Sequence, residues 1–153
     1  MARSLGMGVR AKLTEAMASG GPAAAIGICG EAAAEVGASL QKDGVQVGRS
    51  SLRLRNPANT GPDWVQAWLL GQGERLAAEA SPFVDKTPTS VRVALPIAVE
   101  APCVACHGSP EALAPEIRAA LAQRYPSDRA TGYAVGDLRG AVWAEVPRQV
   151  SGG

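Results

Sequence analysis

The sequence is poor in the side chains that bind metals and form disulfides. It has one histidine, His107, and three cysteines, Cys29, Cys103 and Cys106, among 153 residues. Three cysteines are too few, and odd in number, for the disulfide framework of a small secreted domain. A single histidine excludes any metal site built from two imidazoles of one chain. The chain therefore has only four thiol and imidazole side chains with which to build a metal or redox site.

Bulky side chains, long apolar runs and blocks of one charge are also scarce. Aromatic residues make up 4 % of the chain, so a large apolar cofactor would supply volume that the side chains lack. No apolar run reaches the roughly 18 residues of a membrane span, because Glu31 and Glu35 interrupt the most apolar stretch. The net charge is +1 and no charge block occurs, which speaks against a nucleic-acid surface.

The length and the two ends of the chain predict a single domain. A chain of 153 residues is long enough for one hydrophobic core and short for two. We expect an N-terminal helix within residues 1–20 and a flexible tail at 148–153. Residues 1–21 lack the apolar region of about 7–15 residues that an export signal requires, so the sequence as given shows no signal peptide.

The periodicity of apolar residues predicts helices and strands in alternation. Gly20, Gly21 and Pro22 separate two helices, and Cys29 lies on the apolar stripe of the second. The predicted elements are helices at 4–18, 22–41, 62–80 and 109–124, and strands at 45–55, 90–99 and within 132–147. This order indicates an α+β domain with a small, mainly antiparallel sheet.

Residues 103–108 read CVACHG and carry the most specific signal in the chain. The C-x-x-C-H pattern is the attachment site of a c-type haem. Two thiols three positions apart can form thioether bonds with the two vinyl groups of one haem, and the adjacent imidazole can then bind its iron. Cys103 and Cys106 are the candidate anchors and His107 is the candidate iron ligand. Shuffling the chain would produce this pattern on the order of 10⁻⁴ of the time.

Two other interpretations of the same residues remain open. The two cysteines of the motif form a C-x-x-C dithiol, although they do not lie in the βαβ setting of a thioredoxin-like site. Alternatively, Cys29, Cys103, Cys106 and His107 together form a Cys₃His zinc site, but consecutive ligands at 106 and 107 would strain its tetrahedral geometry.

The second axial ligand of a haem stays open at this point. The candidates are Cys29, a lysine, water, no ligand, or a methionine at position 1, 7 or 17. A cysteine on an apolar helix face is ordinarily a small buried hydrophobe. A thiolate ligand, in contrast, would stabilise ferric iron and lower its reduction potential. Covalent haem attachment normally takes place outside the cytoplasm, so a periplasmic or other extracytoplasmic location is expected.

Three stretches resemble one family. CVACHG, with ALPI before it and YPSDRATGYAVGDLRGA after it, is similar to the C-terminal signature of a bacterial family of c-type haem proteins, once catalogued as a domain of unknown function. GGPAAAIGICGEAA resembles the family's cysteine-bearing helix, and RSSLRLRNPANTGPD resembles its strand and RNPxN loop. Together they span about residues 15–147.

The resemblance implies a PAS-like haem domain that covers the chain. It implies one haem c bound covalently through Cys103 and Cys106, with His107 and Cys29 as the two axial ligands. Members of this family occur as separate extracytoplasmic proteins and as sensor segments of signalling proteins, so the resemblance also implies redox or gas sensing.

Polar residues in two segments suit the two haem propionates. Guanidinium groups and a phenol bind carboxylates well. The candidates are Arg53, Arg55, Asn56, Tyr133 and Arg139. The alternative is that the arginines are solvated or tie a turn. The three tryptophans are expected to be core residues or walls of the haem site.

Two functions follow from these predictions. The first is a sensor in which reduction of the iron, or binding of CO or NO, displaces Cys29. The alternative is a small electron-transfer cytochrome with fixed ligands. We expect no catalysis, because an open iron would need a distal acid or base. The expected partners are a small gaseous ligand or a redox protein, with no nucleic acid and with homo-oligomers left open.

Overall fold

The computed structural model describes residues 1–148, except for the side chains of residues 28–30. The predicted tail at 148–153 therefore lies, apart from residue 148, outside the described residues. No single helix in the described part is long and apolar enough to cross a membrane. The elements are α1 (Ala2–Leu40), β1 (Gln46–Ser50), η1 (Pro57–Thr60), α2 (Asp63–Gln72), η2 (Ala77–Glu79), β2 (Phe83–Lys86), β3 (Ser90–Ala98), η3 (Ala101–Cys103), α3 (Val104–His107), α4 (Pro115–Arg124) and β4 (Leu138–Pro147).

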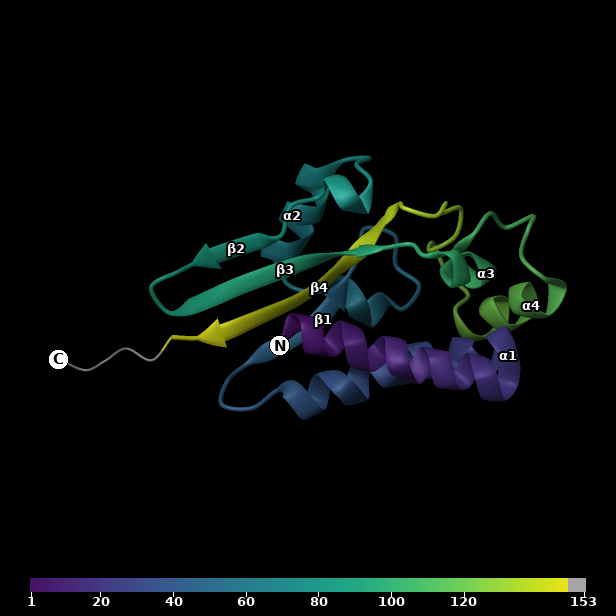
Figure 1. Ribbon diagram of the computed structural model, residues 1–153, viewed down its shortest axis with the longest axis horizontal. Helices are drawn as coiled ribbons and strands as arrows, with labels where there is room; N and C mark the ends of the chain where they lie inside the picture. The colour runs from purple at the N-terminus through teal and green to yellow at the C-terminus, as the bar shows by residue number, and fades with distance from the viewer. Residues whose placement is uncertain (149–153) are drawn as a thin grey trace.

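An antiparallel four-stranded sheet forms the centre of the molecule. Its strand order is β1-β4-β3-β2, so the first and last strands lie side by side. In Figure 1, α1 lies along one side of the sheet and α2 along the other, while α3 and α4 lie beyond one end of the strands. These features confirm the α+β class and the small antiparallel sheet.

Helix α1 is a hairpin of two arms. Gly21 breaks it with φ 70° and ψ −175°, and Pro22 follows directly. A residue with a side chain rarely adopts this positive φ, so glycine is suited to the position. The arms pack side by side (Figure 1): Lys12 pairs with Glu35, and Gly8 faces Val36. The predicted division into two helices at Gly20–Pro22 is confirmed.

Each face of the sheet has its own apolar core. Residues of α1 pack on one face, and residues of α2 pack on the other. The first core contains Leu5, Val9, Val47, Val142 and Ala144, and the second contains Val65, Leu69, Ala94, Ala141 and Trp143, with Trp64 and Trp68 packed against it. The tryptophans are thus core residues, as expected. A Cβ at Gly48 would lie 2.7 Å from Trp143 Cζ2, so this strand position must be glycine for the indole to fit.

Several predicted boundaries are wrong. The strand predicted at 45–55 ends at Ser50, because the Ser51 hydroxyl takes over as the partner of the Arg53 N–H and the Arg139 carbonyl. The helix predicted at 62–80 ends at Gln72, followed by Gly73 with φ 62°. The helix predicted at 109–124 begins only at Pro115. Strand β2 was not predicted, because its four residues alternate between partly buried and exposed positions and give only a weak apolar signal.

Glu145 of β4 links three elements on the α2 side of the sheet. Its Oε1 accepts hydrogen bonds from Ser90 Oγ at 2.6 Å and Arg92 Nε at 3.0 Å, and its Oε2 accepts one from Trp64 Nε1 at 3.2 Å. These donors, Ser90 first, hold the pKa of Glu145 below its usual 4.5.

We predict that Glu145→Gln lowers the free energy of unfolding by about 1–2 kcal/mol, since charge-assisted hydrogen bonds become neutral ones. The carboxylate stabilises the fold above pH 4.5, its ordinary pKa, and this contribution is lost as the pH falls through the lowered value. Urea unfolding at several pH values measures both effects. The control Glu35→Gln breaks an exposed pair and should change stability by less than about 1 kcal/mol. Equal losses in the two variants would contradict the prediction.

Candidate functional site

The CVACHG segment follows β3 at one end of the sheet. The Val99 N–H donates a hydrogen bond to the Asp137 carbonyl just before β4. The η3 turn then leads into the single-turn helix α3. Both cysteines are partly buried, and they face different apolar clusters. Cys103 packs against Val99 and Tyr133, whereas Cys106 packs against a cluster that contains Ile26 of α1 and Leu121 of α4.

A backbone carbonyl orients the imidazole of His107. Its Nδ1 lies 2.7 Å from the carbonyl oxygen of Ala130. A carbonyl can only accept a hydrogen bond, so Nδ1 carries the proton and the lone pair of the neutral ring lies on Nε2. Among the described residues, none forms a hydrogen bond with Nε2. The imidazole is thus held in the tautomer that a metal ligand bound through Nε2 requires.

The surroundings of His107 keep the ring neutral. Burial, followed by the positive charges of Arg139 and Arg55, lowers the pKa of His107 from 6.5 to about 3, and the hydrogen bond to Ala130 opposes this shift only in part. The ring also stands edge-on to Tyr133, with centroids 6.3 Å apart. His107 therefore offers a lone pair, rather than a second proton, at neutral pH.

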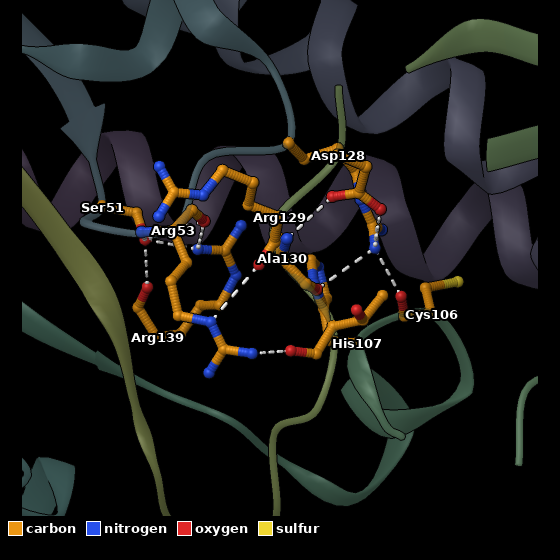
Figure 2. A network of polar contacts seen from close by, with 10 residues as sticks. Ser51, Arg53, Cys106, His107, Asp128, Arg129, Ala130 and Arg139 are labelled. Carbon is orange, nitrogen blue, oxygen red and sulfur yellow. Dashed lines mark hydrogen bonds and ion pairs between the residues drawn. The ribbon is translucent and has the colours of Figure 1, made fainter. Parts of the chain in front are cut away.

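The loop at 128–133 connects this histidine to the rest of the site (Figure 2). Its Tyr133 N–H donates to the His107 carbonyl at 2.9 Å, so the loop runs alongside the attachment segment. The carboxylate of Asp128 accepts from the Ala130 N–H at 2.8 Å. This Asx turn fixes the residue whose carbonyl orients His107.

Arg55 binds both the loop and the attachment segment. Its guanidinium donates to Asp128 Oδ2 from Nε at 3.2 Å, and from Nη2 to the carbonyls of Cys106 at 2.5 Å and Ala130 at 3.3 Å. The side chains of Arg55 and Asp128 are only 12 % and 10 % exposed. Of the candidate arginines, Arg55 is thus the one already neutralised by an acidic partner.

Arg53 and Arg139 flank the ring of Tyr133. The guanidinium carbons lie 4.2 Å and 5.4 Å from the ring centroid. Arg53 donates to the carbonyls of Arg129 and Thr131, and Arg139 Nη1 donates to Ser51 Oγ at 2.7 Å. The structure thus brings these three predicted residues together.

These two arginines have no acidic partner among the residues that the structure describes. Burial lowers the pKa of Arg139 to about 10, against the opposing effect of the nearby Tyr133 phenol. The Nε atom of Arg139 is buried and has no hydrogen-bond partner. A buried cationic donor without a partner is costly, so the region around Tyr133 and His107 favours an anionic ligand.

Asn56 lies apart from this group. Its Oδ1 accepts from the Ala58 N–H at 3.0 Å and caps η1. The side chain lines a cleft of about 260 Å³ between α1 and the edge strand β1, whereas a second cleft of about 220 Å³ lies beside α4. Neither Cys103, Cys106 nor His107 lines these two clefts.

Cys29 belongs to α1, but its side chain lies outside the described residues. The positions around it lie close to the attachment segment: Ile26 shares an apolar cluster with Cys106, and Glu31 pairs with Arg124 of α4. Among the residues whose side chains the structure describes, no group of three or more His, Cys, Asp and Glu is arranged to hold a metal ion. Cys29, which the zinc alternative needs, is not one of those residues.

The sequence prediction missed Ser51, Asp128 and Ala130. The Ser51 hydroxyl and the Ala130 carbonyl have no sequence signature, because their roles depend on partners that are distant along the chain. Asp128 did have a local signal, since a Pro-Ser-Asp stretch often forms an Asx turn. What the turn holds, His107 and Arg55, is visible only in three dimensions.

Comparison with known proteins gives two findings. The profile of the family described as Tll0287-like matches residues 4–147. Among solved structures, the cyanobacterial heme-protein Tll0287 is similar, with 26 % sequence identity and a TM-score of 0.67 over 99 % of this chain and 92 % of that chain. No curated protein matches the chain.

We predict that Ser51→Ala lowers the free energy of unfolding by about 1–3 kcal/mol. The hydroxyl is buried and binds the Arg139 carbonyl, the Arg139 guanidinium and the Arg53 N–H, so its loss leaves buried groups unpaired. Thermal unfolding of the variant measures this. Ser39→Ala removes an exposed hydroxyl that bonds Val36 and serves as the control. A stability loss no larger than that of the control would contradict the role assigned to Ser51.

Proposed function

The chain belongs to the Tll0287-like family, and we propose that it binds one haem c covalently and acts as a redox or gas sensor. The observation that carries the proposal is the state of His107. The C-x-x-C-H segment places its imidazole beside two cysteines, and the Ala130 carbonyl leaves the Nε2 lone pair for a metal. The solved relative is a heme-protein by its title.

The residues of the attachment segment fit a haem. In this proposal Cys103 and Cys106 form the two thioether bonds, and His107 binds the iron through Nε2. When bound, the haem supplies an iron that changes oxidation state and takes diatomic ligands. The protein holds the imidazole in one tautomer and orientation, which keeps the iron ligand basic.

The two arginines without acidic partners fit the propionates. Arg53, Arg139 and the Tyr133 phenol lie together beside His107, and the buried Arg139 Nε lacks an acceptor. A propionate would supply that acceptor and neutralise the charge. Arg55 is less suited, because Asp128 already neutralises it, and Asn56 is occupied as a cap. We therefore assign the propionate role to Arg53, Tyr133 and Arg139.

Cys29 is the proposed second axial ligand. Its segment of α1 reaches the attachment segment through Ile26 and reaches α4 through Glu31. A ligand on α1 would couple the iron to a helix that covers the sheet.

The antiparallel sheet, with its first strand beside its last, supports the PAS-like description.

The sensor proposal depends on how firmly Cys29 stays bound. Reduction of the iron, or binding of CO or NO, would displace the thiolate, and the freed α1 arm would carry the signal. A fixed thiolate would instead support the second candidate, a small electron-transfer cytochrome. The proposal assigns no catalysis, an extracytoplasmic location because of the covalent attachment, and a gas or redox protein as partner.

We predict that the chain, expressed in a host that matures c-type haem, keeps its haem on a denaturing gel. Thioether bonds survive unfolding, whereas axial bonds do not. The double variant Cys103→Ser, Cys106→Ser should lose all gel-bound haem stain. Cys29→Ser is the matched control and should retain it. Loss of haem from the parent chain under denaturing conditions would contradict covalent attachment.

We further predict that Cys29→Ser changes the absorption spectrum of the ferric protein, because a thiolate ligand is removed. Met17→Leu removes another candidate ligand and should leave the spectrum unchanged. The ferrous parent should bind CO, as a sensor with a labile ligand requires. An unaltered Cys29→Ser spectrum would exclude this ligand, while unchanged ligation in both oxidation states without CO binding would favour the electron-transfer cytochrome.

A further inference from the structure

Two hydrogen bonds converge on one carbonyl beside the proposed iron ligand. The Ala130 oxygen accepts from His107 Nδ1 at 2.7 Å and from Arg55 Nη2 at 3.3 Å. The same Nη2 atom donates to the carbonyl of Cys106 at 2.5 Å. Cys106 directly precedes His107, so the Arg55 guanidinium holds both the backbone next to the imidazole and the acceptor of the imidazole proton.

Asp128 completes this arrangement from the other side. Its Oδ1 accepts the Ala130 N–H at 2.8 Å, and its Oδ2 lies 3.1 Å from Arg55 Nη2 and 3.2 Å from Nε. The carboxylate thus fixes Ala130 and the guanidinium at the same time. Both side chains are almost wholly shielded from water, so the attraction between their charges is only weakly screened.

We propose that Arg55 and Asp128, here termed the Arg55–Asp128 clamp, are positioning residues that hold the Ala130 carbonyl on His107 Nδ1 and so set the tautomer and basicity of the iron ligand. The predicted effect of the clamp on the iron rests on the proposed function, because it requires a bound haem. The structural effect of the clamp, the control of the His107 tautomer, applies to the chain with or without haem.

The physical argument is that hydrogen bonding to the remote nitrogen makes the ligand nitrogen more basic. A more basic imidazole stabilises ferric iron and lowers the reduction potential. The clamp uses two nitrogens of the planar arginine fork: Nε donates to the Asp128 carboxylate while Nη2 donates to the two carbonyls. A lysine ammonium has one nitrogen and loses the second donor to Asp128. Arg55→Lys keeps the charge and removes the fork, whereas Asp128→Asn keeps an oxygen for Ala130 and removes the charge.

The single histidine of the chain makes a direct test practical. With ¹⁵N-histidine labelling, the two ring nitrogens of His107 give the only histidine signals in an NMR spectrum of the haem-free full chain at neutral pH. The parent should show the Nδ1–H tautomer. In Arg55→Lys and in Asp128→Asn, the ratio of Nδ1–H to Nε2–H forms should fall roughly tenfold, as expected for weakening one buried hydrogen bond.

Arg92→Lys is the matched control. Arg92 forms a second partly buried arginine ion pair, with Glu145 at 3.0 Å, on the α2 side of the sheet. The Arg92→Lys variant should give the same His107 NMR signals as the parent. In the haem-loaded proteins, the reduction potential should move to higher values in the two clamp variants and stay unchanged in the control.

The outcomes separate the clamp from the proposed function. Clamp variants with parent-like circular dichroism, parent tautomer ratio and parent potential would overturn the clamp while leaving haem binding intact. A parent chain that takes up no haem would overturn the proposed function, and the tautomer ratio would still decide the clamp. If Arg55→Lys fails to fold, Asp128→Asn decides alone.

Discussion

The hydrogen bond from His107 Nδ1 to the Ala130 carbonyl is the interaction on which the site depends. It fixes the tautomer, leaves the Nε2 lone pair available, and ties the attachment segment to the loop at 128–133. The sheet positions the two partners of this bond. Strand β3 delivers the C-x-x-C-H segment, and β4 begins just after the loop, so the two partners of the bond emerge from neighbouring strands at the same end of the sheet.

The arginines around the histidine fall into two groups, one with an acidic partner and one without. Arg55 is neutralised by Asp128 and holds the backbone in place, whereas Arg53 and Arg139 stack on Tyr133 and have no acidic partner within the described residues. Burying uncompensated charge costs stability, which a bound dianionic group would recover. Arginines of similar appearance in the sequence therefore have different surroundings: Arg55 supports the protein's own backbone, and we propose that Arg53 and Arg139 bind an anion.

Sequence patterns predicted those parts of the structure that depend on residues close together in the chain. The Gly-Pro break in α1 and the apolar run of β3 each involve residues within a few positions, so both elements could be predicted directly. The partners of the site could not be predicted in this way. Arg55 and Asp128 are 73 positions apart, and Ser51 and Arg139 are 88 apart. No periodicity links such pairs, and the Ser51 contact is also why the predicted strand is shorter in the structure.

The most direct test of the account is pulsed EPR of the ferric protein, matured with haem and labelled with ¹⁵N-histidine. Because His107 is the only histidine, the account predicts a strong hyperfine coupling from one directly bound histidine nitrogen and a weak one from a remote nitrogen whose proton exchanges slowly. Absence of any strong coupling to ¹⁵N-histidine would show that His107 does not bind the iron and would contradict the account.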